Sequence, residues 1–266
     1  MLSFLKTLGK IGAFLLVVVL IVSVFAYVYT SEKFNLRNVT VYGCKEVDPE
    51  KLEAIIRQDF PANILRIDLV KLKNRLEKES WAKSIEIRRI LPSNLVIYVQ
   101  ERVPAAILEM HNELMMADKD GILLGKYDPR FGKLDVPVFK GILGEDAEGY
   151  RLYQEENTAR IQQALFMLAD IESGLPNYTS QISEVDVSDR QNLKILLVDD
   201  TAEVYLGDKD YLKRFRTFVG NLSEYQKLKL QYSEFASIDM RYEGQIVYRP
   251  RRETPEQSPV SNNGRF

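Results

Sequence analysis

The feature that most constrains this chain is an uncharged, strongly apolar stretch over residues 11–31, close to the N-terminus. A helix of about 20 apolar residues, rising about 1.5 Å per residue, crosses a hydrocarbon core of about 30 Å. Lys6 and Lys10 precede the stretch, and two tyrosines lie near its far end, where an interfacial aromatic belt is expected. We therefore expect one transmembrane helix, with residues 1–10 in the cytoplasm and the rest of the chain delivered across the membrane.

A cleaved signal peptide is the alternative interpretation of this segment. Val24-Phe25-Ala26 resembles a cleavage site because small residues occupy its two recognised positions. However, the apolar region of a signal peptide usually runs for only about 7–15 residues, and this one is longer. The pattern therefore favours a retained anchor.

Composition excludes several classes of function. With a formal net charge of −2, the chain has no overall field that would attract nucleic acid. Its single cysteine, Cys44, cannot form an intramolecular disulfide, and we interpret it as a small residue at a turn. Its single histidine, His111, has no second histidine or cysteine with which to bind a metal. We therefore expect no cofactor, no metal, no nucleic acid and no small-molecule substrate.

Residues 34–103 have the pattern of a small layered domain. Strands are expected over residues 36–42, 85–88 and 95–99. Asp48 and Asp68 each stand where they would cap an amphipathic helix, and Trp81 is expected to be a large core anchor. The predicted unit is β-α-α-β-β, with two helices covering one face of a three-stranded sheet.

Residues 104–250 are predicted to form a second, mostly antiparallel β domain with helices, which makes the fold class α+β. The Asp120-Gly121 turn lies between two apolar runs and predicts a hairpin over residues 106–124 rather than a calcium loop. Further strands are expected over residues 182–187, 193–198, 202–206, 237–241 and 245–249, and helices over residues 157–173 and 208–225. Proline, arginine and serine are frequent in residues 251–266, which are expected to be disordered.

Several runs of sequence occur together in the order typical of one bacterial family. They are FNLRNVTVYG at 34–43, SWAKSI at 80–85, RRILP at 88–92, LVIYVQERVPA at 95–105, DG at 120–121, VPVFKG at 136–141, VYLG at 204–207 and SIDMRY at 237–242. The first run resembles the opening strand of a POTRA domain. Together the runs resemble the bacterial cell-division family FtsQ (DivIB) over residues 11–249, which consists of a POTRA domain and an FtsQ-type β domain.

The resemblance implies a non-enzymatic scaffold of the divisome, the cell-division assembly at the septum. Such a protein is a single-pass protein of the inner membrane, with its C-terminal domains outside the cytoplasm. It recruits the partner proteins FtsB and FtsL and links early to late division components. Its POTRA domain and transmembrane helix are expected to contact other divisome membrane proteins. Whether the outer compartment is a periplasm or a Gram-positive cell surface stays open.

The resemblance also implies a partner-binding site. Matching the family's segment places Arg241 and Tyr242 in the strand that receives FtsB, where the arginine pairs with an acid and the tyrosine packs on an apolar side chain. Met240 stands where the family usually has leucine, and the last strand departs from the usual pattern. Tyr248 is the expected second aromatic contact. Physically, such binding adds a strand to an exposed sheet edge.

Two other hypotheses compete with this one. Another POTRA-containing adaptor for protein assembly or translocation would carry tandem POTRA units or a large barrel, and neither pattern is present. A membrane-tethered hydrolase would need a catalytic group of carboxylates, for which Glu101, Asp199 and Asp200 are available. Nothing in the sequence brings these three acids together.

Overall fold

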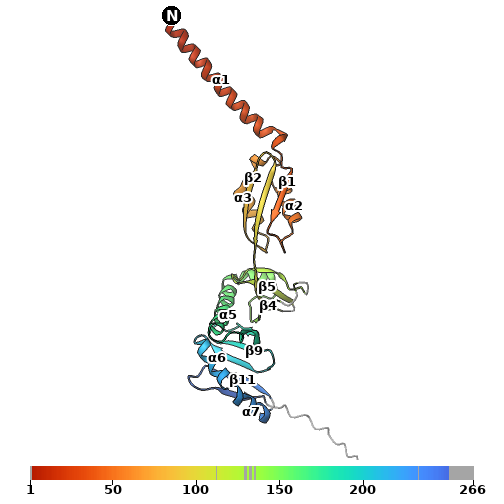
Figure 1. The fold of residues 1–266 in the computed structure, drawn as a ribbon, viewed down its shortest axis with the longest axis vertical. Helices are drawn as coiled ribbons and strands as arrows, with labels where there is room; N and C mark the ends of the chain where they lie inside the picture. The colour runs from red at the N-terminus through yellow and green to blue at the C-terminus, as the bar shows by residue number, and fades with distance from the viewer. Residues whose placement is uncertain are drawn as a thin grey trace, which may run out of the picture. The chain divides into compact units, whose positions relative to one another are not determined.

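The computed structural model describes residues 2–111, 113–128, 131, 134, 136–232 and 234–251 (Figure 1). The chain divides into two compact units, residues 1–102 and residues 103–266. The expected disordered tail lies outside the described residues from position 252 onward. Each unit has a hydrophobic core of its own.

The chain begins with the helix α1 (Leu2–Thr30), and its segment Gly9–Thr30 is long and apolar enough to cross a membrane. The prediction of one apolar helix near the N-terminus is therefore confirmed, although α1 begins at Leu2, nine residues before the predicted start, and ends one residue before the predicted end. Ser31 follows the helix, and its hydroxyl accepts a hydrogen bond from the Lys33 backbone N–H at 3.3 Å. This bond caps the short 3-10 helix η1 (Glu32–Phe34), through which the chain enters the first sheet.

The rest of the first unit has the predicted β-α-α-β-β order. Its strands are β1 (Asn38–Tyr42), β2 (Ala82–Ile90) and β3 (Asn94–Glu101), and its helices are α2 (Pro49–Asp59) and α3 (Leu69–Leu76). The sheet order is β1-β3-β2, in which β1 runs parallel and β2 antiparallel to the central strand β3. A second 3-10 helix, η2 (Ile64–Arg66), connects the two α-helices.

The predicted helix caps are present in the first unit. A carboxylate oxygen of Asp48 accepts from the Glu50 N–H at 2.9 Å, and a carboxylate oxygen of Asp68 accepts from the Val70 N–H at 3.0 Å. Each bond satisfies a donor that the helix itself leaves unpaired. Trp81 differs from the prediction, because it is only partly buried at the edge of the core. The anchors at the centre of this core are aliphatic: Leu52, Ile56, Ile64, Leu72, Leu76, Leu95 and Ile97.

One carboxylate closes the loop that follows β1. A side-chain oxygen of Glu101, at the end of β3, accepts from the backbone N–H groups of Lys45, Glu46 and Val47 at 2.8, 2.9 and 2.7 Å. The loop begins at Gly43, whose φ of +85° places it in the left-handed region, and a Cβ there would collide with the backbone of Val99.

The second unit is built on a nine-stranded sheet in the order β12-β11-β10-β9-β8-β7-β4-β5-β6. The strands are β4 (Pro104–Met110), β5 (Glu113–Asp118), β6 (Leu123–Lys126), β7 (Val138–Lys140), β8 (Ile182–Asp186), β9 (Leu193–Leu197), β10 (Glu203–Gly207), β11 (Phe235–Asp239) and β12 (Val247–Pro250). Five of the pairings are antiparallel and three are parallel. The prediction of a mostly antiparallel domain is confirmed.

Helices cover one face of this sheet and bury the core between them and the strands (Figure 1). They are α4 (Ala147–Leu152), α5 (Gln154–Gly174), α6 (Tyr211–Gly220) and α7 (Leu222–Tyr232). The single helix predicted over residues 208–225 is wrong, because the chain breaks at Asn221 into α6 and α7. The Asn221 side chain donates to the Thr217 carbonyl at 2.7 Å, and the preceding glycine disfavours a continuous helix.

The other face of the sheet carries a ladder of charges. Lys140 of β7 pairs with Glu184 of β8 at 2.8 Å. One strand further along, Lys194 of β9 pairs with Asp186 of β8 at 2.7 Å and lies 3.6 Å from Glu203 of β10. Because these paired charges remain solvated, the hydrophobic core lies only on the face of the sheet that the helices cover.

Candidate partner-binding surface

The residues implicated by the sequence lie around the loop that joins β11 to β12, which we call the β11–β12 loop (residues 240–246). The chain turns at Tyr242–Gln245, where the Gln245 N–H donates to the Tyr242 carbonyl at 3.3 Å. Gly244 has a φ of +69°, a conformation that favours glycine. Arg241 and Tyr242 therefore follow β11, which ends at Asp239, instead of lying within a strand as predicted. In addition, β11 is an interior strand between β10 and β12.

Arg241 is held by a bidentate ion pair. Its Nε and Nη2 donate to the two carboxylate oxygens of Asp239 at 2.8 and 2.6 Å, and its backbone N–H donates to the same carboxylate at 3.1 Å. The guanidinium also lies over the ring of Tyr205, 5.1 Å from its centroid. The Asp239 side chain is only 2% exposed, whereas that of Arg241 is 37% exposed. The buried acid thus fixes an arginine that still reaches solvent.

These contacts change the acidity of Asp239. The hydrogen bonds from Arg241 hold the pKa of the Asp239 carboxyl below its usual value, against the opposing effect of burial. The same pairing raises the pKa of Arg241. The pair is therefore fully ionised at neutral pH.

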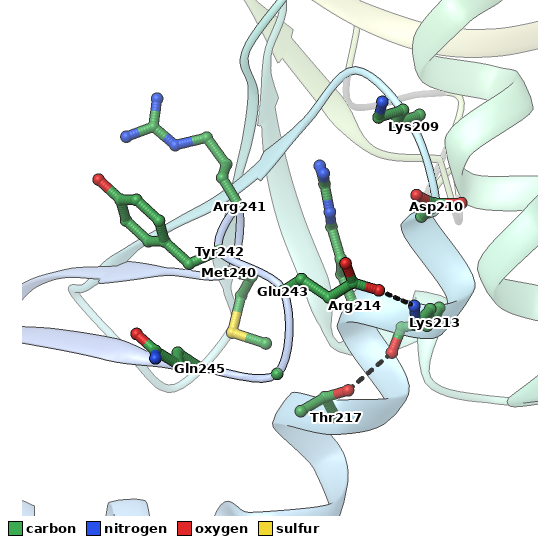
Figure 2. A pocket seen from close by; sticks show the side chains of 11 residues that line it. Lys209, Asp210, Lys213, Arg214, Thr217, Met240, Arg241, Tyr242, Glu243 and Gln245 are labelled. Carbon is green, nitrogen blue, oxygen red and sulfur yellow. Dashed lines mark hydrogen bonds and ion pairs between the residues drawn. The ribbon is translucent and has the colours of Figure 1, made fainter.

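Tyr242 presents an aromatic ring to solvent beside this arginine. It is 52% exposed, and Figure 2 shows Arg241 and Tyr242 projecting on the same side of the loop. An exposed aromatic side chain next to an anchored arginine is a combination enriched at protein interfaces.

The loop and the start of α6 enclose a shallow hollow of about 270 Å³ (Figure 2). Basic residues outnumber acidic ones in its lining, four to two: Lys209, Lys213, Arg214, Arg241, Asp210 and Glu243. Lys213 and Glu243 pair across it at 2.9 Å, and Arg214 bonds the Leu206 carbonyl. The lining therefore has an excess of positive charge.

Gly207 allows these side chains to approach the end of β10. Its φ is +77°, and a Cβ there would run into the Arg214 guanidinium and lie 3.3 Å from the Arg241 side chain. The glycine that ends the VYLG run thus favours this backbone conformation, and a Cβ there would displace the flexible end of Arg214.

Tyr248 lies apart from the other two predicted contacts. It is in β12, and its ring stacks on Tyr225 at 5.5 Å and packs against Phe235 at 5.7 Å, toward the helical side. Burial raises the pKa of its hydroxyl, which has no hydrogen-bond partner among the described residues. The side chain is therefore a core residue at the sheet margin, and its predicted role as a contact stays a prediction.

The backbone of Tyr248, in contrast, lies on the open margin of the sheet. β12 pairs only with β11 among the described strands. The Arg251 N–H donates inward to the Glu234 carbonyl at 3.0 Å. Because N–H groups alternate in direction along a strand, the Tyr248 N–H points outward, whereas Pro250, at the next outward position, has no N–H to donate. Among the described strands β12 thus has an unpaired edge, at which the Tyr248 backbone is available to an added strand.

Two of the three acids considered for catalysis, Glu101 and Asp200, have partners within their own units. Glu101 belongs to the first unit and holds the loop after β1. Asp200 belongs to the second unit, where it accepts from the Tyr225 hydroxyl at 2.7 Å and from Lys229 at 3.2 Å. Within the described ranges, no group of three or more His, Cys, Asp or Glu side chains is placed to hold a metal ion.

Sequence reasoning missed Asp239 and Tyr205 as partners of Arg241. The i, i+2 spacing of Asp239 and Arg241 is visible in the SIDMRY run and is compatible with a pair at a strand end. Tyr205 gives no such signal, because its position beside Arg241 depends on the parallel register of β10 with β11, in which Tyr205 aligns with Asp239.

An apolar helix long enough to span a membrane precedes a β-α-α-β-β unit and a β-rich unit, which is the arrangement of a POTRA protein and suggests a single-pass membrane anchor. Residues 34–102 match the family model described as POTRA domain, FtsQ-type, and residues 106–241 match the one described as Cell division protein FtsQ/DivIB, C-terminal. The chain belongs to the FtsQ/DivIB family of cell-division proteins. These matches favour that family over the other POTRA adaptors considered from the sequence.

Several curated relatives carry the name Cell division protein FtsQ. The protein of Koribacter versatilis is 26% identical over 235 residues, which cover 85% of this chain and 64% of the relative. That of Syntrophotalea carbinolica is 25% identical over 183 residues, covering 69% and 63%. The protein of Neisseria meningitidis is 25% identical over 232 residues, covering 86% of this chain and 87% of its own length. The chain thus spans less than two thirds of the first two relatives.

Proposed function

We propose that this protein is a non-enzymatic divisome scaffold that recruits FtsB and FtsL and links early to late division proteins at the septum. In this proposal residues 1–10 are cytoplasmic and residues 11–31 cross the inner membrane once. The POTRA domain (residues 34–103) and the β domain (residues 104–250) lie outside the cytoplasm. Membership of the FtsQ/DivIB family and the single apolar helix support it.

One observation carries the partner-binding part of the proposal. The loop that exposes Arg241 and Tyr242 leads directly into β12, the strand at the margin of the sheet. A partner segment that adds a strand to β12 gains backbone hydrogen bonds along the edge. The same segment, continued past the start of β12, meets the arginine and the tyrosine, which supply side-chain specificity. Strand addition therefore takes place at β12, and the β11–β12 loop fixes its register.

The charge of the surface indicates the chemistry of the partner. Arg241 is anchored by Asp239 through Nε and Nη2, so its position is fixed before a partner binds, and its exposed side is presented to solvent. An anchored arginine loses less side-chain entropy on binding than a free one. A partner with an acidic residue opposite Arg241 and an apolar residue against Tyr242 fits this surface.

The test is capture of FtsB–FtsL by the full-length, detergent-solubilised chain. Tyr242→Ala should weaken capture by about 10- to 100-fold, the range typical of an interface hot spot. The matched control is Tyr153→Ala, because Tyr153 is 51% exposed in the same unit but lies away from the loop, at the start of α5. Unchanged capture by Tyr242→Ala on a folded chain would show that the partner binds elsewhere.

The role of Arg241 in binding is tested with a conservative substitution. Arg241→Glu would place a second carboxylate beside the buried Asp239 and destabilise the loop, so a loss of capture would be ambiguous. Arg241→Lys keeps the positive charge and removes the bidentate geometry. Its capture should fall less than that of Tyr242→Ala. In addition, hydrogen exchange of the Tyr248 N–H, which points outward from β12, should slow in the complex, and an unchanged rate there would contradict strand addition.

Topology is tested separately. A reporter fused after Phe266 should be active only outside the cytoplasm, and the intact chain should sediment with membranes. Recovery of a soluble protein that starts near Tyr27 would show that the apolar segment is a cleaved signal.

A further inference from the structure

The POTRA unit has one end that lies against the exit of the transmembrane helix. The Asn63 side-chain amide donates to the carbonyls of Val28 and Tyr29, both at 3.2 Å, in the last turns of α1. Asn63 is itself buried, and its side-chain oxygen accepts from the Leu65 N–H at 2.9 Å. The connection between α2 and α3 is therefore fixed at the end of the helix. It carries Arg66, an exposed residue in η2.

The turn between β2 and β3 lies at the same end. The Arg37 N–H donates to the Ser93 carbonyl at 2.8 Å, which joins the segment leaving the membrane to this turn. Arg37 follows Thr30 by seven positions, a reach of at most about 25 Å. Arg89 of β2 bonds the carbonyl of Ile67, so the β2–β3 turn is also tied to the connection that carries Arg66.

Exposed apolar side chains occupy the tip of this turn, which we call the β2–β3 tip (residues 90–92). Ile90 is 51% exposed and Leu91 is 57% exposed, and Pro92 follows them. A solvated hairpin turn usually carries polar residues. The composition of this tip is therefore typical of a segment that is buried away from solvent.

The surroundings of the tip are strongly basic. The three segments that meet at this end are residues 31–37, 60–67 and 88–93. They contain five basic residues, Lys33, Arg37, Arg66, Arg88 and Arg89, and one acidic residue, Glu32. Arg88 is paired with Glu86 at 2.7 Å and Arg89 bonds the Ile67 carbonyl, which leaves Lys33, Arg37 and Arg66 as the exposed cations outside these two interactions. The whole chain has a formal net charge of −2, so this local excess of positive charge runs against its overall balance.

We propose that the β2–β3 tip inserts Ile90 and Leu91 into the membrane interface, and that Lys33, Arg37 and Arg66 bind the headgroups of anionic lipids. Apolar side chains flanked by cations are the combination that holds a peripheral segment at a negatively charged bilayer. The contact gives the POTRA domain a second attachment beside α1 and limits its rotation above the membrane. It rests on α1 spanning the membrane, as proposed above.

The test uses the single tryptophan of the chain. Trp81 precedes β2, and the nine residues of β2 separate it from the tip by about 30 Å. In full-length protein reconstituted into phosphatidylglycerol–phosphatidylcholine vesicles with brominated acyl chains, Trp81 should keep its emission. The variant Leu91→Trp in a Trp81→Phe background should be blue-shifted and lose most of its emission. A red, unquenched tryptophan at position 91 would overturn the proposal and favour a protein partner for the tip.

The cations are tested in the same system. Each of Arg37→Gln and Arg66→Gln should reduce the ratio of inserted to free tip by about fivefold in anionic vesicles, as expected for about 1 kcal/mol per cation. Lys45→Gln, at the Glu101 end of the same unit, is the matched control and should change nothing. Quenching that is equal in pure phosphatidylcholine vesicles and insensitive to both substitutions would refute the role of anionic headgroups.

Two further measurements keep the outcome decisive. Flotation of the vesicles reports whether α1 is anchored, so failure of the anchor is distinguished from failure of the tip to insert. If the tryptophan variant does not fold, a nitroxide on Leu91→Cys in a Cys44→Ser background reports the same depth. Greater accessibility to oxygen than to a water-soluble nickel complex is the expected result, and the reverse would contradict insertion.

Discussion

The ion pair between Arg241 and Asp239 should make a measurable contribution to the stability of the second unit. Arg241→Gln removes two charge-assisted hydrogen bonds of 2.8 and 2.6 Å and leaves the buried carboxylate with the backbone donor at 3.1 Å. A hydrogen bond to a charged group contributes about 1.5–3 kcal/mol. Because the Arg241 side chain is 37% exposed, water partly replaces these bonds and screens the charge. We therefore expect a total loss of about 1.5–3 kcal/mol.

A double-mutant cycle isolates this contribution. Asp239→Asn should lower the free energy of unfolding by about 1–2 kcal/mol, and the double variant should lose little more than Arg241→Gln alone, which gives a coupling of about 1–2 kcal/mol. The assay is urea unfolding of the full chain in mild detergent, followed by circular dichroism. Trp81 fluorescence reports the first unit and serves as the internal reference.

The pH dependence of the unfolding free energy lost in Arg241→Gln gives a second readout. The pKa of Asp239 is lowered in the folded state, so the stabilisation is complete above its unfolded value of about 4 and is lost as the pH falls through the lower, folded value. The difference between wild type and Arg241→Gln should therefore stay constant from about pH 5 to 8 and shrink below about pH 4. The reasoning would be refuted if the two single variants each lost under about 0.5 kcal/mol and their losses were additive. It would also be refuted if the difference in stability between wild type and Arg241→Gln persisted in acid.

Three other predictions concern the first unit. Glu101→Ala removes the acceptor of three backbone N–H groups and should lower the unfolding free energy by about 2–4 kcal/mol in urea melts, whereas Glu101→Gln, which keeps an oxygen, should lose less than half of that. The pKa of the Cys44 thiol is raised by burial and by the nearby carboxylates of Glu101 and Asp48. Its alkylation at pH 8 should therefore be several-fold slower than that of free cysteine and should reach the free rate in urea. A normal alkylation rate in the folded chain would contradict this prediction. Trp81→Ala should cost about 2 kcal/mol rather than the 3–5 kcal/mol typical of a fully buried aromatic, and a loss above about 4 kcal/mol would mean that Trp81 is buried.

Much of the fold follows from local chemistry that is legible in the sequence. Asp48 and Asp68 cap helices because an acceptor there satisfies free N–H groups wherever the helix later packs. The SIDMRY run indicates Arg241 and Tyr242 as contact residues, and both lie in the β11–β12 loop, but their role as contacts stays a prediction. Sheet order was not predictable, because β10 and β11 lie side by side although two helices separate them in the chain. For the same reason the sequence placed Arg241 in a strand and gave no sign that Tyr205 lies beneath it.

The burial of individual side chains was harder to predict, for a different reason. Trp81 was expected in the core because its apolar area is large, but it stands just before β2, at the end of the sheet, where neighbours cover it only in part. The ring of Tyr248 completes an aromatic cluster with Tyr225 and Phe235, which its sequence pattern does not indicate, and its role as a partner contact stays a prediction. Side-chain direction at a sheet margin depends on the helix packed beneath it, and α7 was not recognised from its pattern.

The place of β11 and β12 in the chain has a consequence for biogenesis. The first unit is complete once Arg102 has been made, because its last strand, β3, is the central one that both neighbours require. The edge offered by β12 exists only after every other described strand has been synthesised. Under the proposed topology and docking site, a chain arrested during export would hold a folded first unit but would present no β12 edge. The same proposal restricts recruitment through β12 to chains whose last strand has been translocated.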